Sequence, residues 1–297
     1  MSNSSVPARL ASIEAPEFDL ELTLRSGQAF HWSKSGEGYV GTIENTPVYA
    51  EQREAVFLVT PGTESLAHHY FALDHSPAAI LASFPNDPAM NTAIEYCRGM
   101  RILRQPPWEC LATFITSSMK QVAHIRQMSL AIRKKFGQRV QLGDAELFTY
   151  PSPARLAKAT EEELRECKLG YRAKNLLGTA RLIADNVVNL DRIKTMDDPA
   201  ALAELCKLPG VGEKVANCVM LFAYGRLRAF PIDVWIGRVL REIYFKRKRN
   251  ATPKQLRDFS QTYFGNYGGY AQQYLFHHAR MKKRNEAGKQ EKHTRRK

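Results

Sequence analysis

The chain has 297 residues, 44% apolar and 25% charged, proportions that exclude a largely disordered protein. Its 43 Lys and Arg against 30 Asp and Glu give a formal charge of +13, which favours a polyanionic partner, with nucleic acid ahead of a membrane surface. No run of about 18 apolar residues and no signal-peptide pattern occurs, so we expect a soluble, intracellular protein of one large domain or two.

The first hundred residues read as strand-rich. Residues 18–24 alternate apolar and polar side chains, and residues 39–52 and 55–61 are short runs of β-branched and aromatic residues separated by turn residues. We predict an antiparallel sheet domain over residues 1–100, with short helices at 66–73 and 90–96.

The pattern changes after Arg101, where apolar residues recur at spacings of three and four. We therefore predict an α+β fold, in which the sheet domain is followed by an all-helical domain over residues 101–280. Residues 281–297 form a basic tail that we expect to be disordered. From Arg280 onward there are nine Lys or Arg and two Glu, so this segment carries +7 of the total charge.

The five cysteines show no pattern of a structural site. They are scattered and odd in number, which argues against a disulfide framework, and no two have the CxxC spacing of zinc or iron–sulfur ligands. They are Cys97, Cys110, Cys167, Cys206 and Cys218.

The string LPGVGEKVAN predicts two helices joined by a tight hairpin. Pro209 cannot continue the first helix, while Gly210 and Gly212 allow a close backbone approach. The free amides at the start of the second helix suit a DNA phosphate. A bare PGxG turn is a common helix connection, but the full string is much more specific.

Lys214 and Asp233 are the candidate catalytic residues. Lys214 lies in the first turn of the second helix, where the positive end of the helix dipole disfavours an ammonium, so a neutral amine could act as a nucleophile. Asp233, in FPIDVWI, opens a later helix. A plain helix N-cap would explain it, yet a carboxylate there could also deprotonate Lys214 or stabilise a cationic sugar.

LPGVGEKVAN followed by FPIDVWI resembles the helix-hairpin-helix, Gly/Pro-rich loop, Asp superfamily of DNA glycosylases. Within it, the chain is most similar to the 8-oxoguanine DNA glycosylase/lyase family. Further matching strings occur in order over residues 18–280: LTLRSGQAFHW, YFALD, GMRILRQPPWECLATFITSS, LGYRAKNL and GYAQQYLF.

The resemblance implies a bifunctional repair enzyme acting on duplex DNA that contains an oxidised purine. The damaged base is flipped into a pocket, Lys214 displaces it and forms an imine at C1′, and β-elimination cuts the strand. No cofactor is implied. We expect a monomer that associates with DNA and not with a membrane. It would be found in the nucleoid and cytoplasm, or in the nucleus if the source is a eukaryote.

The resemblance also assigns the base pocket. Gly27 matches the glycine whose carbonyl accepts from N7–H of 8-oxoguanine, a group that guanine lacks. Gln272 matches the reader of the Watson–Crick edge, and Phe276 and Cys218 match the residues on the two faces of the base. Without the resemblance, Gly27 would be a turn glycine, Phe276 and Cys218 core residues, and Gln272 a surface residue.

The DNA contacts match only partly. Tyr171 and Arg172 match residues that wedge the duplex and bond the widowed base. Met119 and His124 stand where animal and fungal members have asparagine and an arginine that checks for cytosine, so we do not expect strict selection of cytosine. Trp235 replaces a histidine of those members and removes one expected phosphate contact.

Three hairpin carbonyls, those of Cys206, Leu208 and Val211, match a structural cation site of the superfamily.

The sequence as a whole leaves two other functions open. One is a glycosylase for other oxidised or alkylated bases, and the other is a non-catalytic helix-hairpin-helix DNA-binding protein.

Overall fold

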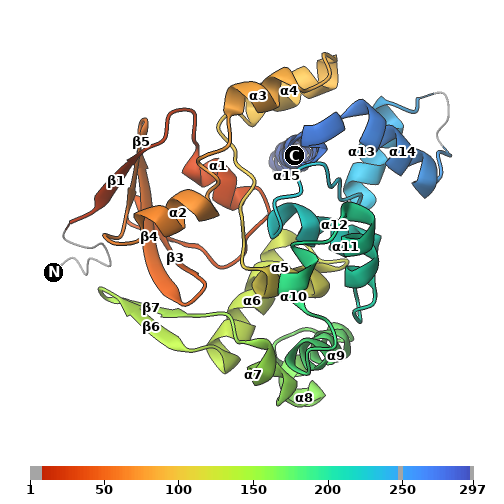
Figure 1. The fold of residues 1–297 in the computed structure, drawn as a ribbon. Coiled ribbons are helices and arrows are strands. Elements are labelled where there is room, and N and C mark those ends of the chain that lie inside the picture. The colour runs from red at the N-terminus through yellow and green to blue at the C-terminus, as the bar shows by residue number, and fades with distance from the viewer. Residues whose placement is uncertain (1–8, 247–249, 295–297) are drawn as a thin grey trace.

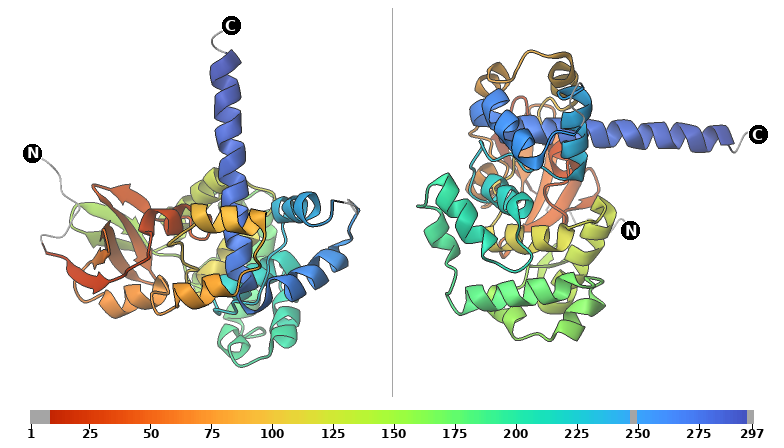
Figure 2. Two further views of the ribbon diagram at one scale, coloured as in Figure 1. Left: turned by 90° about the horizontal axis from the view of Figure 1, so that it is seen from above. Right: turned by 90° about the vertical axis from the view of Figure 1, so that its right-hand side faces the viewer.

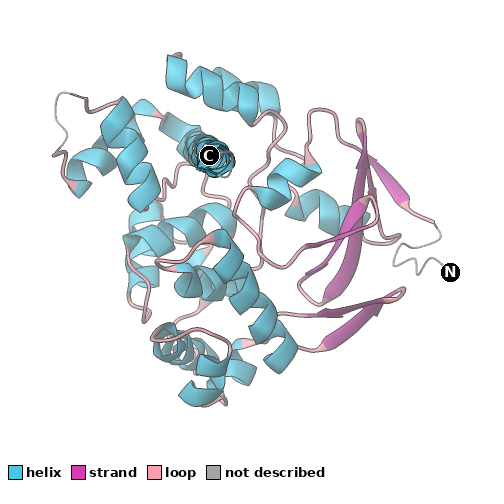
Figure 3. Cartoon of the chain, turned by 180° about the vertical axis from the view of Figure 1, so that it is seen from behind, coloured by secondary structure: helices cyan, strands magenta, loops and turns pink. Residues whose placement is uncertain are grey.

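The computed structural model describes residues 9–246 and 250–294, with side chains as far as Glu286. Its first part contains the predicted antiparallel sheet, whose five strands lie in the order β1-β5-β4-β3-β2. All the strands lie on one side of the molecule and most of the helices on the other, so the predicted α+β fold is confirmed (Figures 1 and 3). The strands are β1 (Ala11–Glu14), β2 (Ser33–Ser35), β3 (Gly38–Ile43), β4 (Thr46–Arg53) and β5 (Val56–Val59).

The strand predicted at residues 18–24 is wrong, because this segment contains helix α1 (Leu20–Arg25). Asp19 caps it: its carboxylate accepts from the Leu22 amide at 2.7 Å. Leu20, Thr23 and Leu24 are buried, which is the three-and-four spacing of a helix. A six-residue segment of this composition satisfies both periodicities, and the cap decides between them.

Helices make up most of the remaining chain, as predicted. They are α2 (Glu64–Tyr70), α3 (Pro77–Ala82), α4 (Pro88–Tyr96), α5 (Pro107–Ser117), α6 (Val122–Phe136), α7 (Pro153–Ala157), α8 (Glu161–Glu166), α9 (Arg172–Ala184), α10 (Leu190–Ile193), α11 (Asp198–Cys206), α12 (Glu213–Phe222), α13 (Val234–Ile243), α14 (Pro253–Tyr263), the 3-10 helix η1 (Gly265–Tyr267) and α15 (Gly268–Thr294). No helix in the described part of the chain is both long and apolar enough to cross a membrane.

Two apolar cores hold these elements. The smaller core fills the space between the sheet and helices α1 and α2, with Trp32, Phe57 and Phe71 among its members. The larger core lies among the helices, and it also includes residues between Ile80 and Met100. Helices α3 and α4 therefore pack with the helical part of the molecule, although they precede it in the sequence.

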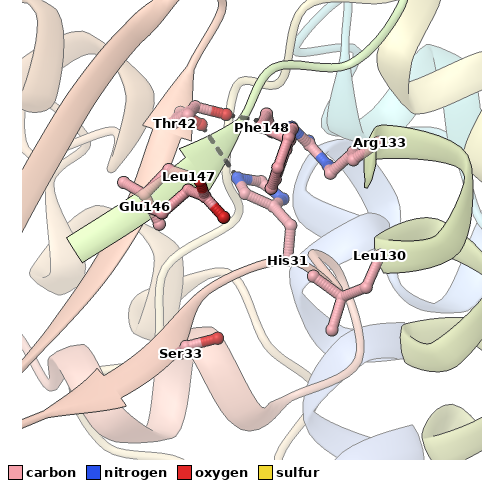
Figure 4. A pocket seen from close by; sticks show the side chains of 9 residues that line it. His31, Ser33, Thr42, Leu130, Arg133, Glu146, Leu147 and Phe148 are labelled. Atoms are coloured by element: carbon pink, nitrogen blue, oxygen red, sulfur yellow. Dashed lines mark hydrogen bonds between the residues drawn. The ribbon is translucent and has the colours of Figure 1, made fainter. Parts of the chain in front are cut away.

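A second, unpredicted sheet contacts the main sheet and helix α6. Strands β6 (Arg139–Leu142) and β7 (Ala145–Phe148) form a hairpin beneath the main sheet (Figure 1). Beside it, Arg133 pairs with the buried Glu109 and donates to Thr42 Oγ1 at 2.9 Å and to the Phe148 carbonyl at 3.1 Å. His31 and Arg133 line a cavity of about 110 Å³ at this junction (Figure 4). These bonds tie helix α6 and the hairpin to the main sheet.

The tail predicted to be disordered is helical as far as Thr294, because helix α15 continues through residues 281–294; residues 295–297 lie outside the described part. Figure 2 shows this second half of α15 standing clear of the body. The segment is polar, which suggested disorder, but Lys, Arg, Glu, Gln and Ala are good helix formers. The packed first half of α15 supplies the nucleus from which these residues continue the helix.

We expect acid to destabilise the fold through two histidines. His75 Nε2 accepts from Arg104 Nη2 at 2.8 Å, and His277 Nδ1 accepts from Arg280 Nη2 at 3.2 Å. Burial, reinforced by these arginines, lowers the pKa of each imidazole to about 4. Between pH 6.5 and 4 the unfolded chain therefore binds more protons than the folded one. From pH 7 to pH 4.5 the free energy of unfolding should fall by up to about 2 kcal/mol for each histidine, a figure that solvent screening reduces. Urea denaturation at pH 7 and pH 4.5 measures this, and equal values would contradict it.

Candidate active site

The helix-hairpin-helix predicted from LPGVG is present, with α11 and α12 as its two helices. Gly210 has a φ of +78°, and a Cβ there would lie 2.8 Å from Asn175 Cβ on α9. Thr179, also on α9, donates to the Pro209 carbonyl at 3.0 Å. Nothing lies within 4 Å of the Cβ position at Gly212, which caps α12. The hairpin is therefore held from one side by α9 and open at the start of α12, as a phosphate site requires.

Lys214 is half-buried in the first turn of α12. Its Nζ donates to Ser117 Oγ at 3.5 Å and lies 5.3 Å from the centre of the Phe114 ring. Both partners belong to α5, so the end of that helix positions the amine. Ser117 is not among the residues predicted from the sequence, although it lies in the matching FITSS string.

Asp233 caps α13, and its Oδ1 accepts from the Ile236 amide at 2.8 Å, which confirms the N-cap interpretation. Lys214 and Asp233 both act on the buried thiol of Cys218. Burial raises the pKa of Cys218 to about 11, the Lys214 ammonium lowers it, and the Asp233 carboxylate raises it. The amine and the carboxylate therefore each lie close enough to Cys218 to affect the pKa of its thiol.

A second group of predicted residues meets where the loop after α1 contacts α15. Gly27 has a φ of +94°, and a Cβ there would lie 3.4 Å from Phe276 Cε1 and 3.7 Å from Val122 Cγ2. Gln272, one turn before Phe276, is buried, and its Oε1 has no hydrogen-bond partner among the described residues. A buried acceptor without a donor is costly and suits a ligand that brings one.

Helix α15 connects this group to the helix of Asp233. Lys283, two turns after Phe276, places its Nζ 4.8 Å from the centre of the Trp235 ring on α13. Arg238 lies over the same ring at 5.8 Å. Two cations therefore lie over the ring of Trp235, two residues after Asp233, which is the N-cap of α13.

A third group surrounds the turn between α5 and α6. Met119 has a φ of +56° and is 92% exposed, an unusual state for an apolar side chain. Tyr171 is 56% exposed, with the Arg172 guanidinium stacked at 4.4 Å from its ring centre. The same turn leads from Ser117, beside Lys214, to Val122, beside Gly27. The turn with the exposed Met119 thus lies between a residue that contacts Lys214 and a residue beside Gly27.

Comparison with known proteins identifies the family. Residues 11–111 match the model of the 8-oxoguanine DNA glycosylase N-terminal domain, and residues 113–264 match that of HhH-GPD superfamily base excision DNA repair proteins. The chain is 31% identical to "N-glycosylase/DNA lyase OGG1" of Arabidopsis thaliana, over 88% of this chain and 77% of that protein. It is 30% identical to the "Probable N-glycosylase/DNA lyase" of Methanothermobacter thermautotrophicus, over 90% and 95%. The chain belongs to the 8-oxoguanine DNA glycosylase family.

A solved member of the family has the same fold. The 8-oxoguanine glycosylase/lyase of Clostridium acetobutylicum, in complex with double-stranded DNA containing cytosine opposite 8-oxoG, is 29% identical to this chain. Its TM-score is 0.86, and the match covers 93% of this chain and 98% of that one. The sheet and the helical part are thus arranged as in an 8-oxoguanine glycosylase bound to DNA.

Arg172, which the resemblance implies as a contact to the widowed base, makes its hydrogen bonds within the protein. It is buried, and its Nε and Nη2 donate to the Ser118 carbonyl at 2.9 and 2.5 Å, while Nη1 donates to the Leu169 carbonyl at 3.2 Å. In this member of the 8-oxoguanine glycosylase family, Arg172 fastens α9 to the turn that carries Met119. His124, on α6, is exposed and free to approach DNA.

The hairpin carbonyls remain a predicted cation site of the family. The Leu208 carbonyl already accepts from the Val211 amide at 3.1 Å, which leaves it one lone pair for a cation. The carbonyls of Cys206 and Val211 would have to supply the other ligands.

Gly27→Ala should impair base excision more than strand cleavage at an abasic site. The Cβ would force an unfavourable backbone and would lie 2.9 Å from Arg280 Nη1 and 3.4 Å from Phe276 Cε1. Gly62→Ala is the matched control, because Gly62 has a φ of +82° with nothing within 4 Å. We expect about a tenfold or larger loss of 8-oxoguanine excision for Gly27→Ala alone. Equal losses in the two variants would show that backbone strain, and not the pocket, is responsible.

Proposed function

We propose that this protein excises 8-oxoguanine from duplex DNA and then cleaves the strand as an AP lyase. The proposal depends most on one observation: Lys214 and Asp233, 19 residues apart, both lie within electrostatic range of the buried Cys218 thiol. A non-catalytic DNA-binding hairpin would have no need to place both an amine and a carboxylate near one buried thiol. The family relatives named N-glycosylase/DNA lyase support the same activity.

The reaction begins when the neutral amine of Lys214 attacks C1′ of the flipped nucleotide. The bond from C1′ to N9 breaks, and the base leaves with the bonding electrons and takes up a proton. Asp233 accepts the proton that Lys214 loses and stabilises positive charge that develops on the sugar. The C1′–O4′ bond of the resulting aminal then opens, O4′ takes up a proton, and the Lys214 nitrogen and C1′ form a protonated imine. This imine acidifies C2′, so loss of a C2′ proton expels the 3′ phosphate, and water then hydrolyses the imine and releases Lys214.

The proposed pocket distinguishes 8-oxoguanine from guanine by the hydrogen bonds that its lining residues offer. The Gly27 carbonyl accepts from N7–H of 8-oxoguanine, whereas N7 of guanine is an acceptor and would repel it. The unpartnered Gln272 Oε1 accepts from the Watson–Crick edge of the base. Phe276 stacks on one face and Cys218 covers the other, with its neutral thiol acting as a small apolar group.

The proposed DNA contacts predict weak selection of the opposite base. The exposed side chain of Met119 can fill the gap left by the flipped nucleotide but offers no directional hydrogen bond. His124 replaces the arginine that would read cytosine, and loss of such a contact removes about 1–3 kcal/mol of discrimination. We expect excision rates opposite the four bases to lie within about tenfold of one another.

Single-turnover cleavage of duplexes with 8-oxoguanine opposite each base tests both statements. Release of 8-oxoguanine with strand cleavage supports the function, and its absence opposite all four bases contradicts it. A panel with other oxidised and alkylated bases serves as the control for substrate class. Equal release of several unrelated bases would mean that the Gly27 and Gln272 contacts do not select the substrate.

A further inference from the structure

Arg280 lies at the edge of the proposed base pocket, and none of the roles described above uses its free donor. Its Nη2 donates to the Arg25 carbonyl at 2.5 Å and to His277 Nδ1 at 3.2 Å, so the guanidinium is held in place. Its Cζ lies 5.5 Å from the centre of the Phe276 ring. Nη1 is buried and has no hydrogen-bond partner among the described residues.

This unpartnered donor faces the groups proposed to hold the base. Nη1 is the atom nearest to the Cβ position at Gly27, at 2.9 Å, and Phe276 Cε1 is the next, at 3.4 Å. A buried guanidinium N–H without an acceptor is unfavourable, and more so when the group is charged. The energy is recovered if a bound ligand places an oxygen there.

The spacing along α15 indicates which part of the base this oxygen belongs to. Gln272, Phe276 and Arg280 are four residues apart, so they share one face of the helix. Gln272 and Arg280 are separated by a rise of about 12 Å, which accommodates a purine over Phe276 with a hydrogen bond at each end. With the Watson–Crick edge at Gln272, the opposite end of the purine, which carries C8, lies toward Arg280.

We infer that Arg280 is a specificity-determining residue whose Nη1–H donates to O8 of the flipped 8-oxoguanine. The inference rests on the proposed function and names one more contact of that pocket. O8 is adjacent to N7, so Arg280 and the Gly27 carbonyl read neighbouring atoms as donor and acceptor. Guanine carries a C8–H at this place and leaves the Arg280 donor unpaired.

Arg280→Met tests the inference, because methionine retains apolar contact with Phe276 and removes the donor. We expect single-turnover excision of 8-oxoguanine to fall by about 10- to 100-fold, while cleavage at a preformed abasic site, which has no base, stays within about twofold. Arg280→Lys keeps the charge with a single donor group and should lose less excision. Arg284→Met, an exposed arginine one turn later, removes the same charge and should change neither activity.

Binding experiments separate O8 from O6, the other oxygen that flanks N7. In a Lys214→Gln background, Arg280→Met should weaken binding to duplexes containing 8-oxoguanine or 8-oxoadenine by similar factors, since both bases carry O8. Weakening for 8-oxoguanine alone would assign the contact to O6 and overturn the inference.

Three other outcomes are distinct. Unchanged excision by Arg280→Met in an active enzyme overturns the inference and leaves the proposed function standing. Equal loss of excision and abasic-site cleavage in both Arg280 variants means that the residue holds the sugar-phosphate backbone or the fold, which also overturns it. If the unaltered protein neither excises 8-oxoguanine nor cleaves abasic sites, the proposed function fails, whatever Arg280 does.

Discussion

Lys214→Gln should abolish both base excision and strand cleavage, with a loss of about a thousandfold or more in the single-turnover rate. Glutamine has a shorter side chain than lysine, but its polar amide can still hydrogen-bond Ser117 Oγ. The amide nitrogen has no lone pair basic enough to attack C1′. Both activities should disappear together, because they share the imine. Cleavage of an 8-oxoguanine duplex and of a preformed abasic duplex measures each activity separately.

Lys207→Gln is the matched control for this change. Lys207 lies at the end of the other helix of the same hairpin, exposed and paired with Glu204 at 2.5 Å. Its loss removes one positive charge from the hairpin without removing the amine of Lys214, so near-normal rates are expected. Binding of Lys214→Gln to the 8-oxoguanine duplex should remain within a few-fold of the unaltered protein. Retained cleavage by Lys214→Gln would mean that another amine is the nucleophile.

Asp233→Asn should separate the two roles of this residue. Asparagine keeps an oxygen that accepts from the Ile236 amide, so the cap of α13 and the free energy of unfolding should change by less than about 1 kcal/mol. The carboxylate is lost, and with it the base for Lys214 and the charge facing the sugar, so excision should fall by about 10²- to 10⁴-fold. Thermal unfolding and single-turnover excision give the two quantities.

Asp197→Asn makes the same chemical change at another cap of the hairpin unit. Asp197 Oδ1 accepts from the Ala200 amide at 2.8 Å at the start of α11. This variant should keep both stability and activity. If Asp233→Asn is as active as Asp197→Asn, then Asp233 is a cap and nothing more.

The catalytic hairpin was predictable because its signals are local. Pro209 ends one helix, Gly210 makes the turn, and Asp233 caps α13. Each of these residues determines the backbone conformation of its close neighbours in the sequence. The roles taken from the family resemblance also concerned residues that the structure brings close together, such as Gly27 and Phe276. Their chemical roles remain proposals until the variants are measured.

The features that could not be predicted depend on distant partners. Arg172 reaches the Ser118 carbonyl, 54 residues away, and Arg280 reaches the Arg25 carbonyl, 255 residues away. Neither hydrogen bond leaves a pattern in the sequence, because the residues next to each arginine would be the same if its side chain were exposed. Helix α1, predicted as a strand, and the helical continuation of α15, predicted as disordered, were missed for another reason, since short or polar segments give an ambiguous periodicity.

Borohydride trapping on an 8-oxoguanine duplex tests directly whether Lys214 is the nucleophile that forms an imine with DNA. Reduction converts the imine between enzyme and DNA into a stable amine, and peptide mass spectrometry then locates the modified residue. We expect a covalent complex at Lys214, absent from Lys214→Gln and retained by Lys207→Gln. An adduct on any other residue, or excision of 8-oxoguanine with no trapped complex, would contradict it.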